Sequence, residues 1–326
     1  MIEQNLDQSD ATVSVIIPAH NEEKMLGALL ASLAVLQFPR ERLQIIVVDH
    51  ESSDATADVA RQGGAQVVTK KGGTISSVRN CGAAVASGQV LAFVDADCTV
   101  AEDWINKALP HLSDSTVGLV GSPYLMPAHP QTWVRKVLQK QADVRPRLSA
   151  AKWLPAGNMF IRRDVYWESS GFDESLTTCE DVDLCFRISQ RYRVIADADI
   201  RCWHYGEPKN LREVFRKELW RGRDNLGGAF RHGLQLYEIP SLLLPLYFLF
   251  LSVLVVILIG ISVLTNWEGS RLIAWMSIAL LLPLVMIAGV TAFRSGDWHH
   301  LPHFAVFYAI YFWARGLAPF YEWRNT

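Results

Sequence analysis

The chain has 326 residues, half of them hydrophobic, and its formal net charge of −2 is close to zero. This length accommodates one α/β domain and an additional region, while the near-neutral charge argues against a nucleic-acid partner. Apolar residues are concentrated after position 238, whereas residues 1–238 have the composition of an ordinary globular domain.

Cysteine usage and the N-terminal sequence both indicate a cytoplasmic first domain. The five cysteines include no Cys-x-x-Cys pair, so we expect reduced thiols rather than disulfides or a thiolate metal cluster. Residues 1–12 are polar and acidic, and the apolar run at 13–17 is too short for the core of a signal peptide.

The first hundred residues alternate short apolar runs with segments typical of helices. The order βαβαβ predicts an α/β fold with an open, mostly parallel sheet and flanking helices. Ligands bind such sheets at the carboxyl ends of the strands. The predicted strands are 13–17, 43–48, 65–68 and 90–94, the predicted helices are 21–36, 53–62 and 75–86, and further strands are expected at 117–121 and 157–161.

Two uncharged segments near the C-terminus are long enough to cross a membrane. Residues 239–264 and 272–293 meet the requirement of about 20 apolar residues, and the short loop between them predicts a hairpin. A buried soluble hairpin is the alternative. Basic residues on either side place both ends of the hairpin in the cytoplasm; they are Arg221, Arg223, Arg231 and Arg294.

Two further segments allow two interpretations each. Residues 301–320 are apolar and aromatic but contain Arg315, so they either span the membrane or lie at its interface. Residues 209–231 are basic and amphipathic, which fits an interfacial helix that contacts anionic headgroups or a solvated charged face. The predicted organisation is a catalytic domain at 1–207, an interfacial segment at 208–238 and a membrane region at 239–326.

The strongest local signal is the pair Asp95 and Asp97, which follows a buried strand in VLAFVDADC. Alternation along an extended chain would place both carboxylates on one side, where they suit a divalent cation that bridges a substrate diphosphate. The alternative is that Asp97 caps a helix near Glu102.

Five segments occur in order between residues 12 and 223: VSVIIPAHNEE, VVDHESSDAT, SSVRNCGAA with the Asp-x-Asp strand, LPAGNMFIRRDVYWESSGFDE and CEDVDLCFRI. Together they resemble the family-2 nucleotide-sugar glycosyltransferases of the GT-A fold. The resemblance implies an enzyme of the hexosyl- or N-acetylhexosaminyl-transferase type, with a nucleotide-diphosphate sugar as donor and Mn²⁺ or Mg²⁺ as cofactor.

The same resemblance implies roles for individual residues. It places the nucleobase site at the end of the first strand and at Asp49, an arginine beside the diphosphate, and an acceptor-side turn near the donor sugar. The loop Phe172–Asp173–Glu174 precedes the catalytic base. The implied donor-site residues are Pro18, His20, Glu22, Asp49, Arg79, Asp95, Gly157 and Asn158.

The catalytic base implied by the resemblance is Asp181, with Glu180 before it. Inversion requires a carboxylate that takes the proton of the acceptor hydroxyl, and such a base contributes roughly 10²–10⁴-fold. Acidic residues at a helix start also stabilise the helix dipole, and both roles are compatible.

The implied metal ligands are Asp97, Asp95 and, as a third, His204. Imidazole suits Mn²⁺ better than Mg²⁺. A single histidine is also often a structural, hydrogen-bonded group, so both interpretations of His204 stay open.

We therefore predict an inverting, metal-dependent glycosyltransferase of the inner (cytoplasmic) membrane. It would transfer one sugar, with UDP as the preferred nucleotide, to a hydroxyl of a lipid-linked or membrane-proximal acceptor in envelope glycan synthesis. The sequence departs from the family at Asp49–His50–Glu51–Ser52, where a pair of acids is usual, so the donor is not carried over from the family.

Four alternatives are considered. A polyprenyl-phosphate monosaccharide transferase has an acceptor phosphate that is already ionised and needs little help from a base, so the Glu180–Asp181 pair argues against this alternative. A processive polysaccharide synthase carries a Gln-x-x-Arg-Trp motif, which residues 216–221 do not reproduce. A catalytically inactive scaffold would not require the three aspartates at 95, 97 and 181, and a nucleotidyltransferase would carry a phosphate-binding loop rich in glycine and basic residues.

Overall fold

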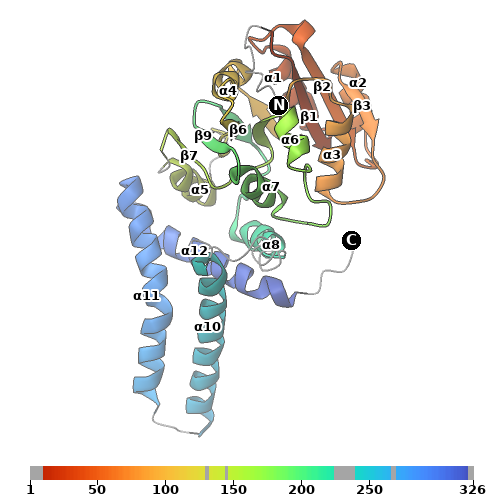
Figure 1. Ribbon diagram of the computed structural model, residues 1–326. Coiled ribbons are helices and arrows are strands. Elements are labelled where there is room, and N and C mark those ends of the chain that lie inside the picture. The colour runs from red at the N-terminus through yellow and green to blue at the C-terminus, as the bar shows by residue number, and fades with distance from the viewer. Residues whose placement is uncertain (1–9, 129–131, 144–145, 224–238, 266–268, 322–326) are drawn as a thin grey trace. The chain divides into compact units, whose positions relative to one another are not determined.

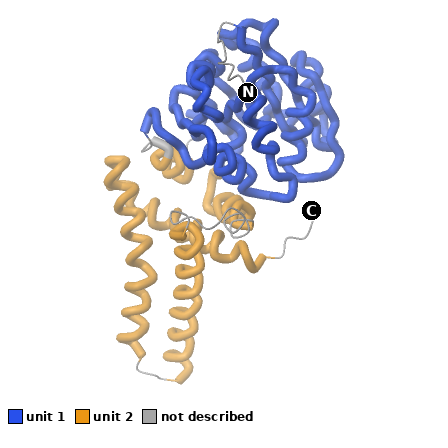
Figure 2. The backbone as a smooth tube through the Cα atoms, viewed as in Figure 1, with its two compact units in different colours: residues 1–129, 145–207 blue, residues 130–144, 208–326 orange. Residues whose placement is uncertain are grey.

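The computed structural model describes residues 10–128, 132–143, 146–223, 239–265 and 269–321. The chain forms two compact units, which Figure 2 distinguishes by colour. Unit 1 contains residues 1–129 and 145–207, and unit 2 contains residues 130–144 and 208–326. Helix α5 (Trp133–Asp143) is therefore an excursion from unit 1 that belongs to unit 2. Part of the predicted interfacial segment, residues 224–238, lies outside the described residues.

Unit 1 is built on an eight-stranded mixed sheet with the order β3-β2-β1-β4-β8-β6-β9-β7. The strands from β3 to β4 run parallel, and β8 is antiparallel to both of its neighbours. The predicted α/β fold is confirmed. The bounds are β1 (Val13–Ala19), β2 (Leu43–Asp49), β3 (Gln66–Thr69), β4 (Val90–Val94), β6 (Val117–Gly121), β7 (Leu148–Ala150), β8 (Asn158–Arg162) and β9 (Arg193–Asp197).

Helices cover both faces of this sheet (Figure 1). Successive side chains of a strand point to opposite faces, so Val15 of β1 packs into one core and Ile16 into the other. Helices α1 and α4 contribute to the first core, and α3, α6 and α7 contribute to the second. Their bounds are α1 (Leu26–Ala34), α2 (Thr56–Gln62), α3 (Ile75–Val85), α4 (Trp104–Leu112), α6 (Arg163–Glu168) and α7 (Glu180–Ser189); a 3₁₀ turn, η1, covers Arg40–Arg42.

The first helix begins later than the sequence predicts. Instead of capping a helix, Asn21 adopts a left-handed backbone conformation with φ 55°. Its N–H donates to Ser52 Oγ over 2.9 Å, and its side-chain oxygen accepts from Ser53 N–H over 2.8 Å. Asn21 therefore joins the loops that follow β1 and β2, and the neighbouring Glu22 stays in a loop at the carboxyl edge of the sheet.

A second, two-stranded sheet stands beside this edge. Strands β5 (Cys98–Val100) and β10 (Cys202–His204) pair antiparallel, with His204 opposite Cys98. This pairing brings a histidine from late in unit 1 next to the aspartate pair that follows β4.

Unit 2 contains two long apolar helices, α10 (Ile239–Thr265) and α11 (Ser270–Ser295), which run antiparallel as a hairpin (Figure 1). By length and composition, α10 and α11 are the two helices among the described residues that could cross a membrane. Besides α5, the described residues of this unit also form α8 (Leu211–Arg221) and α12 (Leu301–Leu317), with 3₁₀ turns η2 (Trp298–His300) and η3 (Ala318–Phe320).

Helix α12 is the third apolar segment of the sequence. Its 17 residues are fewer than the roughly 20 that a membrane span requires. It packs on the hairpin through Phe312, which contacts the side-chain cluster of Phe248 and Leu284. Arg315 Nε donates to Glu218 Oε2 of α8 over 2.8 Å, so its charge is neutralised within unit 2. The short length and the paired charge favour an interfacial helix over a third span.

Candidate active site

An arginine joins two carboxylates at the carboxyl edge of the large sheet. Arg79 Nη1 donates to Glu180 Oε1 over 2.7 Å, and Nη2 donates to Asp95 Oδ1 over 2.9 Å. The residue is only 4% exposed and its guanidinium lies over the Phe172 ring. With both terminal nitrogens engaged and little access to solvent, Arg79 positions the two acids. The place of Arg79 near the diphosphate stays a prediction, with the two acids as its contacts in this structure.

Asp95 is held at both of its oxygens. Besides the Arg79 contact, Asp95 Oδ2 accepts from Tyr124 OH over 2.8 Å. Burial alone would raise the pKa of Asp95, but the positive charges of Arg79 and His204 and its hydrogen bonds outweigh burial and lower it. Asp95 is consequently ionised and rigid.

Gly157 lies against this carboxylate, and a side chain there has no room. A Cβ at position 157 would overlap Asp95 Oδ2 and Tyr124 OH. We expect Gly157→Ala to lower the free energy of unfolding of unit 1 by about 1–3 kcal/mol, the usual range for an overpacked site. Urea unfolding followed by tryptophan fluorescence measures this.

Gly27→Ala is the matched control, because a Cβ there meets only Val59 at an ordinary 3.8 Å. In helix α1, this change should leave stability unchanged or raise it by up to about 1 kcal/mol. Equal stability of the Gly157→Ala protein and the wild type would contradict the close packing described here.

Asp97 faces a histidine across a tight turn. Cys98 N–H donates to Asp95 O over 3.1 Å, so the two aspartates flank a turn instead of alternating along an extended strand as the sequence suggested. His204 Nε2 lies 3.2 Å from Asp97 Oδ1. Strand β5 follows Asp97 and helix α4 has Asp103 at its N-cap, which excludes the helix-cap alternative for Asp97.

His204 lies between two carboxylates, since its Nδ1 is also 3.3 Å from Glu207 Oε1. The histidine ring stacks on Tyr124 with a centroid distance of 4.5 Å. Burial alone would lower the pKa of His204, but Asp97 and Glu207 outweigh burial and raise the pKa to about 9. His204 thus carries a proton at neutral pH unless a metal ion replaces it.

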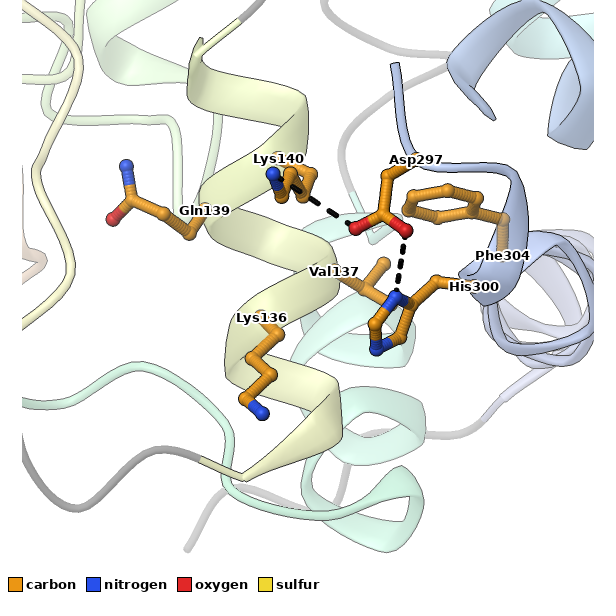
Figure 3. A pocket seen from close by; sticks show the side chains of 7 residues that line it. All are labelled: Lys136, Val137, Gln139, Lys140, Asp297, His300 and Phe304. Carbon is orange, nitrogen blue, oxygen red and sulfur yellow. Dashed lines mark hydrogen bonds and ion pairs between the residues drawn. The ribbon is translucent and has the colours of Figure 1, made fainter. Parts of the chain in front are cut away.

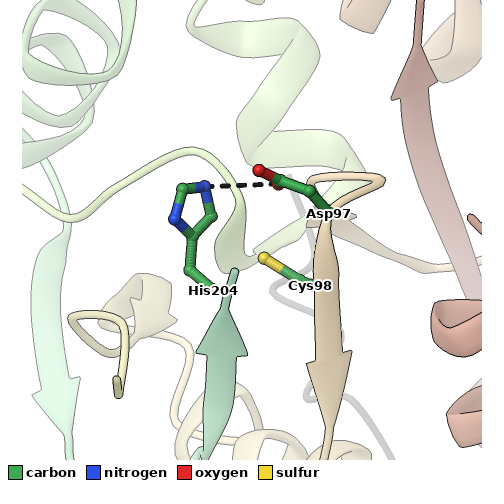
Figure 4. Close-up of side chains that lie close together, drawn as sticks. All are labelled: Asp97, Cys98 and His204. Atoms are coloured by element: carbon green, nitrogen blue, oxygen red, sulfur yellow. Dashed lines mark ion pairs between the residues drawn. The ribbon is translucent and has the colours of Figure 1, made fainter. Parts of the chain in front are cut away.

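The three candidate ligand atoms of Asp97, Cys98 and His204 lie within 4.8 Å of one another (Figure 4). A carboxylate with an imidazole is a donor set that fits Mn²⁺. Burial, together with the neighbouring Cys202 thiol, raises the pKa of Cys98 well above its usual value. Because the thiolate is the form that binds metals, Asp97 and His204 are the candidate ligands of this group and Cys98 is not, and the predicted ligand role of Asp95 stays a prediction.

The two acids at the start of α7 have different surroundings. Glu180 is 9% exposed and paired with Arg79. Asp181 is partly exposed, and its Oδ1 accepts from Val182 N–H over 2.8 Å. Cys179 before them is left-handed, with φ 63°. Glu180 is consequently part of the buried ion-pair network, while Asp181 is the more accessible of the two for an acceptor.

The loop before α7 is anchored to α3 by Asn80. Its amide nitrogen donates to Phe172 O and to Glu174 Oε1, each over 2.9 Å, and its oxygen accepts from Phe172 N–H over 3.0 Å. The ring of Phe172 is 1% exposed and packs on Phe93. This loop therefore fixes the start of α7, and Phe172 contributes to the core.

The predicted nucleobase residues surround the loops after β1 and β2. Pro18 is buried in β1, and Asp49 at the end of β2 is 7% exposed. His20 is exposed, with Nδ1 2.6 Å from His50 O. Burial and the negative charges of Asp97, Asp54 and Asp95 raise the pKa of Glu22, which places Glu22 in the electric field of the aspartate pair.

Asn158 is a structural residue. It is fully buried, and Oδ1 accepts from Trp104 Nε1–H over 2.8 Å. Its amide nitrogen donates to Ser122 and to Ile200 O. These contacts engage both ends of the amide and give the side chain a structural role, while the place of Asn158 in the turn near the donor sugar stays a prediction.

Two residues of the site were not predicted from the sequence, Tyr124 and Glu207. Neither belongs to a recognisable motif. Glu207 lies three positions after His204 in WHYGEP, so its place beside the histidine was a weak available signal. The contact of Tyr124 with Asp95 joins positions 29 residues apart and follows only from the fold.

Comparison with known proteins agrees with this geometry. The sequence model of glycosyl transferase family 2 matches residues 14–170. The glycosyltransferase AglE of Haloferax volcanii is 25% identical over 224 residues, which cover 66% of this chain and 73% of AglE. The beta-monoglucosyldiacylglycerol synthase of Trichormus variabilis is 24% identical over 247 residues, which are 70% of this chain but only 51% of that protein.

Among solved structures, the mannosyltransferase PcManGT from Pyrobaculum calidifontis, in complex with GDP-Man and Mn²⁺, has a TM-score of 0.58 and 18% sequence identity. The match covers 93% of this chain and 87% of PcManGT, which supports the fold. The ordered motifs, the sheet and these similarities show that this chain is a glycosyltransferase with a GT-A fold, whose residues 14–170 match glycosyl transferase family 2.

Proposed function

We propose that this protein is an inverting, metal-dependent transferase that moves one sugar from a nucleotide-diphosphate sugar to a hydroxyl of a lipid-linked or membrane-proximal acceptor. The observation that carries the proposal is the contact chain from Glu180 through Arg79 to Asp95, with the Asp97–His204 pair beside it. It links a candidate metal site to the helix that bears a candidate base.

The donor side combines a rigid acid with a metal-binding pair. Asp97 and His204 would hold a divalent cation, which when bound neutralises charge on the leaving diphosphate. Arg79 and Tyr124 keep Asp95 ionised and oriented. The structure of PcManGT is a complex with GDP-Man and Mn²⁺, which supports Mn²⁺ here. We propose UDP as the nucleotide, with GDP as the alternative to test.

The acceptor side depends on Asp181. Its carboxylate takes the proton of the acceptor hydroxyl while the hydroxyl oxygen attacks the anomeric carbon, and the bond to the nucleoside diphosphate breaks. Attack opposite to the leaving group inverts the anomeric configuration. The pair Glu180–Arg79 holds the start of α7 and thereby fixes the position of the base.

The acceptor and the location follow from unit 2. Helices α10 and α11 are apolar enough to span a membrane, and the name of the Trichormus relative refers to a diacylglycerol lipid. We propose a multi-pass protein of the inner membrane with unit 1 in the cytoplasm. An acceptor that is itself lipid-linked fits an enzyme anchored in this way.

The test is sugar transfer by the purified full-length protein in lipid, with Mn²⁺, a native lipid extract and a panel of nucleotide sugars. Release of a nucleoside diphosphate and labelling of a lipid are followed together. We expect one donor to produce both signals. Release of pyrophosphate would instead indicate a nucleotidyltransferase, and a polymeric product would indicate a processive synthase.

Metal binding should depend on pH through His204. Because its pKa in the folded protein is raised to about 9, a metal ion must displace a proton at lower pH. We expect Mn²⁺ affinity to rise about tenfold per pH unit from pH 6 towards pH 9, and to level off above. Isothermal titration calorimetry measures the affinity and the released proton.

His204→Asn is the matched variant, and its Mn²⁺ affinity should be weaker and nearly independent of pH over this range. The stability of the metal-free protein depends on pH in the opposite direction: it falls as pH rises. The charged histidine stabilises the metal-free fold fully below its unfolded pKa of 6.5, and this contribution is lost as pH rises through about 9. If the Mn²⁺ affinity of the wild type depends on pH as little as that of His204→Asn, His204 is excluded as a ligand.

A further inference from the structure

Unit 2 contains a cavity of about 270 Å³, and none of the residues that line it belongs to the candidate active site. It lies between α5 and the segment that connects α11 to α12 (Figure 3). The lining residues are Lys136, Val137, Gln139, Lys140, Asp297, His300 and Phe304.

The cavity has an apolar part and a cationic part. Val137 is 1% exposed and Phe304 is fully buried, and both belong to the same side-chain cluster of unit 2. Lys136 and Lys140 are four residues apart on α5, so they lie on one face of the helix. Among the described residues, no carboxylate lies within ion-pair distance of Lys136.

Asp297 organises the opposite side of the cavity. Its Oδ1 lies 2.8 Å from His300 Nδ1, and its Oδ2 lies 3.8 Å from Lys140 Nζ (Figure 3). The contact with His300 fixes the orientation of the imidazole. The long contact with Lys140 engages one carboxylate oxygen, and an ammonium group has three N–H donors to offer. The described lining thus holds two ammonium groups, of which only that of Lys140 contacts Asp297, and one carboxylate, which leaves positive charge for an anion.

The position along the chain indicates which anion. Asp297 follows the end of α11, a candidate membrane span, by two residues. On the membrane assignment proposed above, residues just beyond a span lie at the level of the lipid headgroups. Trp298 is 56% exposed, and tryptophan is enriched at this level. Arg294, in the last turn of α11, adds an exposed cation.

We propose that this cavity binds the phosphate group of an anionic phospholipid, with Lys136 and Lys140 as donors to the phosphate oxygens and Val137 and Phe304 against the apolar part of the lipid. Cations at the rim and an apolar floor match a molecule that carries both characters. The site would anchor unit 2 to one lipid at a defined place, in addition to the apolar helices.

The experiment uses the full-length protein in a neutral detergent and native mass spectrometry. Phosphatidylglycerol is titrated, with phosphatidylcholine and inorganic phosphate as comparison ligands. We expect one phosphatidylglycerol molecule to bind preferentially. The double variant Lys136→Gln with Lys140→Gln should weaken this binding about 30-fold, since each lysine near a lipid phosphate strengthens binding by a factor of about 5.4.

The matched control is Arg212→Gln with Arg216→Gln, which removes the same charge at the same spacing from α8. This control should keep the single bound phosphatidylglycerol. Equal loss in both double variants would overturn the proposal in favour of diffuse attraction. Displacement of phosphatidylglycerol by equimolar inorganic phosphate, or equal binding of phosphatidylcholine, would overturn the assignment to an anionic lipid.

Sugar transfer in the same detergent, measured in parallel, separates this proposal from the proposed function. Transfer that persists without specific lipid binding rejects the cavity as a phospholipid site and leaves the transferase assignment intact. Thermal unfolding of both double variants verifies that they fold, which their exposed or half-exposed side chains favour.

Discussion

Asp181→Asn is expected to lower kcat by about 10²–10⁴-fold, because the amide cannot take the proton of the acceptor hydroxyl. The KM for the nucleotide sugar and the affinity for Mn²⁺ should change little, since Asp97, His204 and Asp95 keep their partners. Initial rates at saturating donor and acceptor measure this effect. Because the substitution removes the carboxylate, the decrease in rate at acidic pH that its protonation causes should also disappear.

Asp183→Asn is the control that tests whether Asp181 only stabilises helix α7. Both carboxylates are in the first turn of α7. Asp183 pairs with Arg187 at 2.6 Å on that helix. Favourable charge at a helix start contributes about 0.3–1 kcal/mol, so a purely structural role predicts a lower thermal midpoint for both variants and unchanged kcat for both.

The result also decides between two acceptor classes. A phosphate acceptor is already ionised and does not require a base. If Asp181→Asn transfers sugar as fast as the wild type while donor binding is intact, the polyprenyl-phosphate alternative replaces the hydroxyl acceptor.

Asp97→Asn is expected to lower the rate of metal-dependent turnover by about 10³-fold. A bound cation stabilises the leaving diphosphate by several kcal/mol, and about 4 kcal/mol corresponds to three orders of magnitude in rate. Raising the Mn²⁺ concentration should restore little activity. Rates over a Mn²⁺ titration, with calorimetry on the same samples, separate lost metal binding from lost chemistry.

The same substitution has a consequence that does not depend on turnover. Asp97 contributes most to raising the pKa of His204, so the pKa of His204 should fall from about 9 towards its ordinary value in Asp97→Asn. Histidine NMR signals over a pH titration report this change. A surface control is Asp103→Asn, which removes a carboxylate paired with Lys107 and Arg201; an equal loss of activity there would contradict a specific role for Asp97.

Much of the fold was predictable because the relevant signals are local. Strand β4 has the predicted bounds, α10 extends its predicted segment by one residue at the C-terminal end, and α11 extends its segment by two residues at each end. In both cases hydrophobicity accumulates over neighbouring positions, and the chain needs no distant contact to produce the pattern. The start of α1 was wrong because the partner of Asn21, Ser52, is 31 residues away.

The candidate site was predictable in its residue types and less so in its roles. Asp95, Asp97 and His204 belong to short motifs, and the structure brings them together. Arg79 was expected at the diphosphate, yet its partners Asp95 and Glu180 are 16 and 101 residues away and occupy it. The buried hydrogen bonds of Asn158 likewise depend on residues from Trp104 to Ile200.

The sequence by itself determined the α/β class, the resemblance to family-2 glycosyltransferases, the apolar hairpin and the acids that carry the proposed chemistry, because these depend on composition, periodicity and motifs of neighbouring residues. Only the tertiary structure decided which acid is buried and which accessible, that Tyr124 and Glu207 complete the site, and that α5 joins unit 2 beside a cationic cavity. Burial and ion pairing depend on the environment of each group in three dimensions, and residues distant in the chain create that environment.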